Sequence, residues 1–429
     1  MKKTILSLAI LTLSTFLYAQ KSYTVDELIL QSLENSPDLH ISKLQYNASQ
    51  KRYDTAFSGY LPQVDLTASA GRISQSETYN FSSVDDNLLT GKLSLKQLLY
   101  DFGKTGGDTD TQRYTSQAYL RDNMQKISDK KKDVKNAYYD ILKAIALIDV
   151  QKENVKLTKA QLYRAKRYFE AGIRTKIDIS DAEVRLIKAK LELKKAEYNL
   201  KLSYAQLDKI VGFTQVTQNY TVYSKKLQFD LLYNSLQAYD LNLQEAIDFA
   251  YKNKNEIKKE LSKIKSSQAQ TLSVDAQYYP SLSVSANYLT QKADEYQVYV
   301  PKTQWDAMLN LNWNLYQGGA TSAQSQEQKI NLKISNEELS STKLTIKKST
   351  TIAFINLYKT KDTIELDQSL VKVSNEKFDQ ASKRYEHGLS DYIELQEARQ
   401  GYIDAKATLV VDYYNYYIAI ATLDNAIGK

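Results

Sequence analysis

"LNLNWNLYQGGAT", from Leu309 to Thr321, alternates strictly between large apolar residues and asparagine before it reaches two glycines. An alternation of period two is typical of a β-strand whose two faces differ. The pattern alone does not distinguish a strand that faces a soluble core from a strand that faces lipid. The residues expected on the apolar face are Leu309, Leu311, Trp313 and Leu315.

Three other segments alternate in the same way, near residues 64–79, 88–100 and 281–288. Four short strands are too few to close a barrel, and lipid does not tolerate an open strand edge. Three copies of the chain would supply twelve strands from these four segments, with leucines toward lipid and asparagines toward a watery lumen. The alternative is a soluble protein in which two hairpins pack their apolar faces on helices.

The chain contains two copies of one unit. "LLYDFGK" at Leu98, "YFEAGI" at Tyr168 and "LDKIVG" at Leu207 correspond to "NLYQGGA", "RYEHGL" and "LDNAIG", each 216 residues later. A repeat of this length indicates two tandem supersecondary units. We therefore expect a first repeat at 20–212, an inter-repeat segment at 213–240 and a second repeat at 241–429.

Each copy is expected to form a helix, a β-hairpin, a long helix and a returning helix. The first helix of the first copy is predicted over about residues 25–56. Apolar residues then recur at every seventh position over 120–169 and again over 357–385, which is coiled-coil spacing. The expected ranges are 63–101 and 281–317 for the hairpins, 105–170 and 321–386 for the long helices, and 177–211 and 392–427 for the returning helices.

The composition excludes several classes of function. A net charge of +7 is mild and scattered, so it gives no indication of a nucleic-acid surface. With two His and no Cys, a His/Cys metal site or catalytic nucleophile has almost nothing to be built from. "YDFGKTGG", which starts at Tyr100, lacks the earlier glycine of a phosphate loop, because Leu98 stands there. We expect no metal, no cofactor and no enzymatic activity.

The N-terminus is typical of an exported protein. Lys2 and Lys3 precede an apolar run that ends near Leu17, and the small residue Ala19 offers a cleavage point. This pattern predicts a secretory signal peptide at residues 1–19. A mean hydropathy of −0.50 indicates that much of the remaining chain faces water.

Several motifs together resemble the TolC-type outer-membrane efflux channel family over nearly the whole mature chain. They are the "NLYQGG" junction at Asn314, the "RYEHGLSDYIELQEA" turn at Arg384 and the "YYNYYIAIATLDNAIG" closing helix at Tyr413. The resemblance implies a mainly α fold with a small membrane β-barrel, completed by a homotrimer, and a long α-helical barrel that crosses the periplasm. It also implies a periplasmic adaptor (membrane fusion) protein and an inner-membrane pump of the RND or ABC type as partners, in a Gram-negative cell.

Acidic residues follow each predicted turn at the same spacing. Asp178 and Asp181 follow the first turn, and Glu394 and Glu397 follow the second. Carboxylates in the first turn of a helix complement the helix dipole, which explains the pattern without a special function. The resemblance implies that Glu394 and Glu397 form acidic rings at the periplasmic mouth and that Tyr385 helps to hold this mouth closed, so all five residues are candidate gate residues.

The turns themselves are a second candidate site, because they resemble the tips by which these channels dock on adaptor hairpins. One position departs from the family: Ser390 stands where its well-studied member has an arginine that links to a carboxylate matching Asp178. Arg174 occupies the equivalent place in the first copy and is the expected substitute. The candidate tip residues are Ala171, Gly172, Ile173, His387, Gly388 and Leu389.

The sequence therefore predicts a passive trimeric outer-membrane channel, the exit duct of a tripartite pump that exports drugs or small molecules. One alternative within the family is the duct of a type I protein secretion system. An alternative from another class is a periplasmic coiled-coil scaffold without a pore. The sequence does not identify the cargo or the partner pump.

Overall fold

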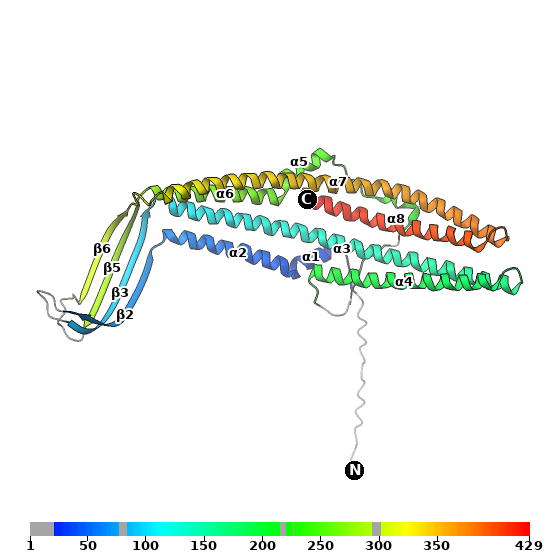
Figure 1. Ribbon diagram of the computed structural model, residues 1–429, viewed down its shortest axis with the longest axis horizontal. Helices are drawn as coiled ribbons and strands as arrows, with labels where there is room; N and C mark the ends of the chain where they lie inside the picture. Colours follow the sequence, from blue (N-terminus) through cyan, green and yellow to red (C-terminus); the bar gives the residue numbers. More distant parts are fainter. Residues whose placement is uncertain (1–20, 77–83, 215–219, 226, 294–301) are drawn as a thin grey trace, which may run out of the picture. The chain divides into compact units, whose positions relative to one another are not determined.

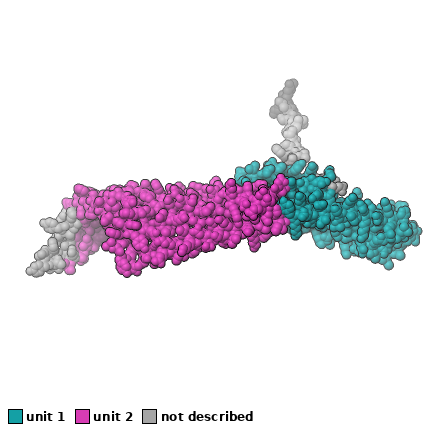
Figure 2. Space-filling view, turned by 90° about the horizontal axis from the view of Figure 1, so that it is seen from above, with its two compact units in different colours: residues 1–36, 130–238, 357–421 teal, residues 37–129, 239–356, 422–429 magenta. Residues whose placement is uncertain are grey.

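The computed structural model describes residues 21–76, 84–214, 220–225, 227–293 and 302–429 (Figure 1). The predicted signal peptide lies outside the described residues. The chain divides into two compact units, each assembled from three separate stretches (Figure 2). Unit 1 contains residues 1–36, 130–238 and 357–421, and unit 2 contains residues 37–129, 239–356 and 422–429.

Apart from the short strand β1, the two copies have the same order of helices and long strands, and the chain is mainly helical, as predicted. The first copy forms β1 (Lys21–Tyr23), α1 (Val25–Asn35), α2 (Pro37–Phe57), β2 (Gln63–Gln75), β3 (Val84–Tyr100), α3 (Lys104–Glu170) and α4 (Lys176–Val211). The strand β4 (Tyr220–Val222) then pairs in parallel with β1. The second copy forms α5 (Leu243–Asn253), α6 (Asn255–Asp275), β5 (Ser281–Ala293), β6 (Thr303–Asn312), α7 (Ala320–Glu386) and α8 (Tyr392–Ile427).

The first helix of each copy is divided in two, so the prediction of one continuous helix over residues 25–56 is wrong. After α1, Ser36 has extended backbone (φ −72°, ψ 116°), and Pro37 begins α2. A proline has no amide hydrogen and restricts the preceding residue to extended conformations, so the helix does not continue through it. The second copy breaks at the corresponding Lys254 (φ −57°, ψ 127°) without a proline.

The returning helices end against these breaks. Gly212 closes α4 and Gly428 follows α8, both with left-handed backbone (φ 86° and 81°). A Cβ on Gly212 would lie 2.6 Å from the carbonyl oxygen of Asn35, and one on Gly428 would lie 3.2 Å from the amide nitrogen of Lys254. Both positions thus require glycine for the positive φ and for the close approach of backbone.

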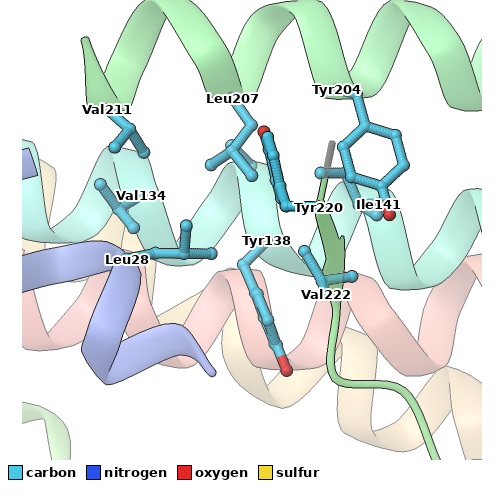
Figure 3. Close-up of a cluster of buried hydrophobic side chains, with 10 residues drawn as sticks. Leu28, Val134, Tyr138, Ile141, Tyr204, Leu207, Val211, Tyr220 and Val222 are labelled. Carbon is cyan, nitrogen blue, oxygen red and sulfur yellow. The ribbon is translucent and has the colours of Figure 1, made fainter. Parts of the chain in front are cut away.

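A hydrophobic cluster in unit 1 joins both ends of the first copy (Figure 3). It brings α1, α3, α4 and β4 together around side chains that are almost entirely buried. The predicted heptad residues Val134 and Ile141 supply its centre, each with no exposed surface, which confirms that part of the coiled-coil pattern. The full cluster is Leu28, Val134, Ala137, Tyr138, Ile141, Tyr204, Leu207, Val211, Tyr220 and Val222.

In unit 2, small residues allow α3 and α6 to pack backbone against backbone. A Cβ on Gly107 of α3 would lie 2.6 Å from the amide nitrogen of Ser273 on α6. The hydroxyls of Thr115 and Ser266 are hydrogen bonded across the same pair of helices at 3.0 Å. Short hydroxyl side chains satisfy each other at this distance and do not force the helices apart.

Candidate functional site

The four long strands form one antiparallel sheet in the order β2-β3-β5-β6. The two hairpins, β2–β3 and β5–β6, are joined through the pairing of β3 with β5. Within the described residues, β2 and β6 are the edges of this sheet, and each is paired on one side. The free edges leave backbone groups that another chain could pair with.

The register aligns apolar residues in rows across all four strands. One row runs from Leu66 through Leu93 and Tyr288 to Trp305. Because neighbours in a row lie on the same face, the face is apolar across the sheet and not merely along each strand. The face predicted from the pattern around Leu309 is therefore one of two chemically distinct sheet faces.

The apolar face is exposed in the chain. The exposed fraction is 78% for Leu66, 76% for Trp305, 66% for Leu309 and 67% for Leu311. An exposed apolar patch that extends over several strands marks contact with a membrane or with another protein. The alternative in which the hairpins bury this face on the helices of the same chain is wrong, because these side chains remain uncovered.

The opposite face is polar and internally hydrogen bonded. Asn287 donates to the Asp306 carboxylate at 2.8 Å, and Asn310 donates to the Ser285 hydroxyl at 2.9 Å. These bonds cross from β5 to β6, so the asparagines between the leucines are part of a cross-strand polar network.

Two of the predicted strand residues lie beyond the strand. The β6 strand ends at Asn312, which pairs with Ser281, so Trp313 and Leu315 are not strand residues. The reason is that Pro280 precedes Ser281 and cannot donate a ladder hydrogen bond. Trp313 donates instead from its indole nitrogen to the carbonyl of Tyr278 at 3.0 Å.

The first turn joins α3 to α4 and exposes the predicted tip residues Ala171, Gly172 and Ile173. Gly172 has φ 73°, which explains the glycine. Asp178 accepts hydrogen bonds from the amide and the hydroxyl of Thr175, at 3.1 and 3.2 Å. Its carboxylate therefore caps α4, as the simpler reading of the acidic spacing predicts.

The second turn joins α7 to α8 and exposes His387, Gly388 and Leu389. Gly388 has φ 71°, almost the value of its counterpart in the first turn. The cap on α8 is different: the Asp391 carboxylate accepts from the amide of Glu394 at 2.8 Å. The side chain of Glu394 instead forms an ion pair with Arg384 at 3.1 Å.

The remaining acidic candidates are solvent-facing. Asp181 and Glu397, each three residues further along its helix, are both exposed. The four predicted carboxylates therefore have different surroundings: one caps a helix, one pairs with arginine, and two face solvent.

Tyr385 is buried at the second turn, with 2% of its surface exposed. Its ring lies 5.9 Å from those of Tyr168 and Tyr392, measured between centroids. The guanidinium of Arg174 lies 5.1 Å from the same ring and donates to the carbonyl of Ser390 at 2.9 Å. Arg174 thus links the two turns through Tyr385 and the Ser390 backbone, and the carboxylate of Asp178 is used for the helix cap.

Burial raises the pKa of Tyr385, although Arg174 opposes the shift. Burial also raises the pKa of Tyr392, to about 12, and Arg399 partly opposes it. Neither tyrosine hydroxyl has a hydrogen-bond partner among the described residues. Two tyrosines that stay neutral in a mostly apolar cluster hold the turns together by packing.

A buried polar layer between α3 and α8 was not predicted from the sequence. Arg399 is 3% exposed and donates to the side-chain oxygens of Asn154 and, at 3.0 Å, of Gln396. Gln396 in turn donates to Gln161 at 2.9 Å. Asn154 and Gln161 each lie one residue before a position of the apolar seven-residue spacing, so that spacing gives no signal for them.

The described residues contain no helix long and apolar enough to cross a membrane. In the same part of the chain, no group of three or more His, Cys, Asp or Glu is arranged to hold a metal ion.

A family model described as outer membrane efflux protein matches residues 28–213 and 246–429, which lie in the two copies. The chain belongs to the outer membrane efflux protein family. Its relatives include the outer membrane protein TolC of Salmonella enteritidis, 22% identical over all of this chain and 86% of that protein. They also include the toluene efflux pump outer membrane protein TtgC of Pseudomonas putida, 20% identical over 94% of this chain and 82% of that protein.

The same fold is found in the crystal structure of the outer membrane protein VceC from Vibrio cholerae. The match covers 94% of this chain and 96% of the VceC chain, with a TM-score of 0.82 and 15% sequence identity. Family membership confirms the predicted class of function, an outer-membrane efflux channel, and the predicted localisation in the outer membrane. Members of the family are channels, and TolC-type proteins work with adaptor and inner-membrane pump components.

Proposed function

We propose that three copies of this outer membrane efflux protein assemble into a channel whose twelve strands close one barrel. The observation that carries the proposal is the sheet, which has one exposed apolar face, one polar face and two edges at β2 and β6. A sheet of this kind is stable in lipid only when its edges are paired. Pairing β6 of one copy with β2 of the next removes every edge.

The helices support the same assembly. The returning helix α4 exposes an apolar stripe at coiled-coil spacing, and α7 exposes another. Stripes of this spacing are buried when a second helix packs along them. The exposed residues are Ile177, Val184, Ile187, Leu191, Tyr198 and Leu202 on α4, and Leu344, Ile352, Ile355, Leu366, Leu370 and Val373 on α7.

The channel is a passive exit duct for small molecules, without chemistry of its own. A periplasmic adaptor docks at the exposed turns around Gly172 and Gly388, and an inner-membrane pump supplies the energy. The efflux-pump name of the Pseudomonas putida relative supports small-molecule export over protein secretion.

The gate lies at the second turn in this proposal. Glu397 is exposed, and Glu394 is partly exposed beside Arg384, whose ion pair offsets part of its charge, so both carboxylates can line a narrow mouth. Three chains would bring six carboxylates together, and their converging fields attract cations. Replacing both residues with Gln is expected to reduce cation selectivity in single-channel recordings, and an unchanged reversal potential would exclude them from the gate.

The assembly is tested on the sheet. Leu311→Arg places a charge on the apolar face, which costs about 2 to 4 kcal/mol at the middle of a bilayer. We expect this variant to lose the trimer in detergent and the pore in planar bilayers. Asn312→Arg is the matched control, because the neighbouring residue points to the polar face and tolerates a charge. Equal effects from the two substitutions would contradict the assignment of the faces.

The helical stripes provide an independent test. Ile187→Glu places a charge in the exposed stripe of α4, whereas Lys188→Glu changes the next residue, which is also exposed. We expect the first variant to weaken the trimer and the second to leave it intact, as measured by cross-linking in detergent. A trimer that resists both substitutions would mean that α4 does not pack against another copy.

A further inference from the structure

Two carboxyl groups meet between α7 and α8, away from the turns. Asp367 of α7 is 8% exposed, and its Oδ2 atom has no donor among the described residues. The neighbouring group is the side chain of Asp412 on α8, which is in hydrogen-bonding contact with it. A buried carboxylate oxygen without a donor is costly unless a proton or a cation satisfies it.

Among the described residues, the charge that acts on Asp367 is that of Asp412. On α8, Asn415 donates from its side-chain amide to Oδ1 of Asp412 at 3.5 Å, and Lys143 of α3 donates to the side-chain oxygen of that asparagine at 3.5 Å. The ammonium of Lys143 is already paired with Asp140 at 2.6 Å. Lys143 is therefore paired with Asp140 and reaches the carboxyl pair only through the amide of Asn415.

The inter-repeat segment provides no positive charge either, within its described residues. Its Tyr233 donates from the backbone amide to Gln368, the residue after Asp367, at 3.1 Å. The ring hydroxyl of the same tyrosine faces the carboxylate of Glu365, which raises the pKa of Tyr233. Neither Tyr233 nor Glu365 neutralises a carboxylate of the pair, and the charge of Asp412 disfavours a second negative charge on Asp367.

Two carboxyl groups in contact are stable when they hold one proton between them, because the protonated group donates and the ionised group accepts. Burial, together with the hydrogen bond and the charge of Asp412, raises the pKa of Asp367 to about 6. Between the ordinary value of an aspartate, about 3.9, and this raised value, the folded chain holds a proton that the unfolded chain has lost. The contribution of the pair to stability therefore falls as the pH rises through this window.

We propose that Asp367 and Asp412 share one proton that fastens α7 to α8, and that loss of this proton loosens the contact between the two helices. The pair then forms a pH-dependent contact between the two helices of the second copy. At the corresponding position of the first copy the chain has Gln151, 216 residues before Asp367, so the first copy lacks the pair. Both aspartates belong to one chain, so this contact does not depend on how many chains assemble.

The test is hydrogen exchange of the full chain in detergent, followed by mass spectrometry of peptides from α7 and α8. After correction for the intrinsic pH dependence of exchange, protection around residues 367 and 412 is expected to fall as the pH rises through about 6. Asp412→Asn removes the shared proton and supplies an amide donor, so protection should no longer depend on pH. Asp404→Asn changes an exposed carboxylate on the same helix and should keep the dependence of the unmodified chain.

A second measurement needs no variant. Infrared difference spectra of the unmodified chain, recorded against pH, should contain a protonated carboxyl band that is lost near pH 6. A chain in which every carboxyl titrates near the ordinary value of about 4 would overturn the proposal, as would an Asp412→Asn variant with unchanged pH-dependent protection. The first result would mean that Asp367 is ionised and satisfied by a cation, and the second would mean that another group causes the pH dependence.

Discussion

Phe169 and Tyr385 hold the same place in the two copies, three residues before the turn glycine, yet their burial is opposite. Phe169 is 43% exposed, whereas Tyr385 is 2% exposed. The backbone of the two turns is nearly the same, since Gly172 and Gly388 have φ values of 73° and 71°. The comparison teaches that the repeated sequence specifies the turn, while non-repeated neighbours decide which copy contributes an aromatic ring to the packing between them.

The carboxylates differ in the same way. Asp178 caps its own helix through Thr175, but in the second copy Asp391 takes the cap and leaves Glu394 to pair with Arg384. One substitution at the cap position, threonine to aspartate, therefore changes what the carboxylate three residues later can do. Equal sequence spacing did not mean equal function.

The largest expected difference between the turns comes from truncating the two rings. Tyr385→Ala removes a fully buried aromatic side chain and should lower the free energy of unfolding by about 3 to 5 kcal/mol. Phe169→Ala removes a half-exposed ring and should cost far less. Denaturant unfolding of the two variants in detergent measures both values. Similar losses would mean that an assembly partner buries Phe169 in the native channel.

The second largest expected difference between the turns is in the pH dependence of stability at alkaline pH. Tyr392 occupies the place that Lys176 has in the first copy, and burial raises its pKa to about 12. The folded chain keeps this proton at pH values where an unfolded tyrosine, with a pKa of about 10, has lost it. Stability should therefore fall as the pH rises from 10 toward 12, and Tyr392→Phe should reduce that slope in thermal unfolding followed by absorbance. An unchanged slope would assign the alkaline loss to other tyrosines.

Substitution of either turn glycine by alanine should destabilise the chain by the same amount. Gly172→Ala and Gly388→Ala each force a side chain into left-handed backbone, at a cost of about 1 to 2 kcal/mol. Neither position has an atom within 4 Å of an added Cβ, so crowding contributes nothing within the described residues. Thermal unfolding of the two variants should give the same shift, and a clear inequality would mean that the turns are not equivalent in backbone strain.

The smallest differences concern the two carboxylates. Asp178→Ala removes a helix cap and should cost about 1 kcal/mol. Glu394→Ala breaks an ion pair between partly exposed side chains, which contributes well under about 1 kcal/mol. Amide exchange in the first turns of α4 and α8 measures each loss locally. If Glu394→Ala unravels α8 as much as Asp178→Ala unravels α4, the division of roles between the copies is wrong.

The features set by local sequence pattern could be predicted. Heptad positions such as Ile141 and Leu357 are buried, and the alternation around Leu309 and Leu311 gives a strand with two faces. The two-repeat organisation also follows from local matches of sequence. These features depend on periodicity within one segment, which a single sequence records directly.

The features set by contacts between distant segments could not be predicted. The end of β6 depends on its pairing with Ser281, and the burial of Tyr385 depends on Arg174 and the first turn. The polar layer of Arg399 and the carboxyl pair of Asp367 each need a partner on another helix. The pattern within one segment does not identify the helix that packs against it, so these pairings are seen only in the three-dimensional structure.

The helices of the two copies have equal lengths, 67 residues in both α3 and α7 and 36 residues in both α4 and α8. An insertion of one residue turns the following side chains by about 100° and carries the apolar stripe away from its partner. An insertion of about seven residues completes two turns and restores the stripe. The helices of this protein can therefore be lengthened only by whole heptads. Each heptad has to be added to both the long helix and the returning helix, and to both copies.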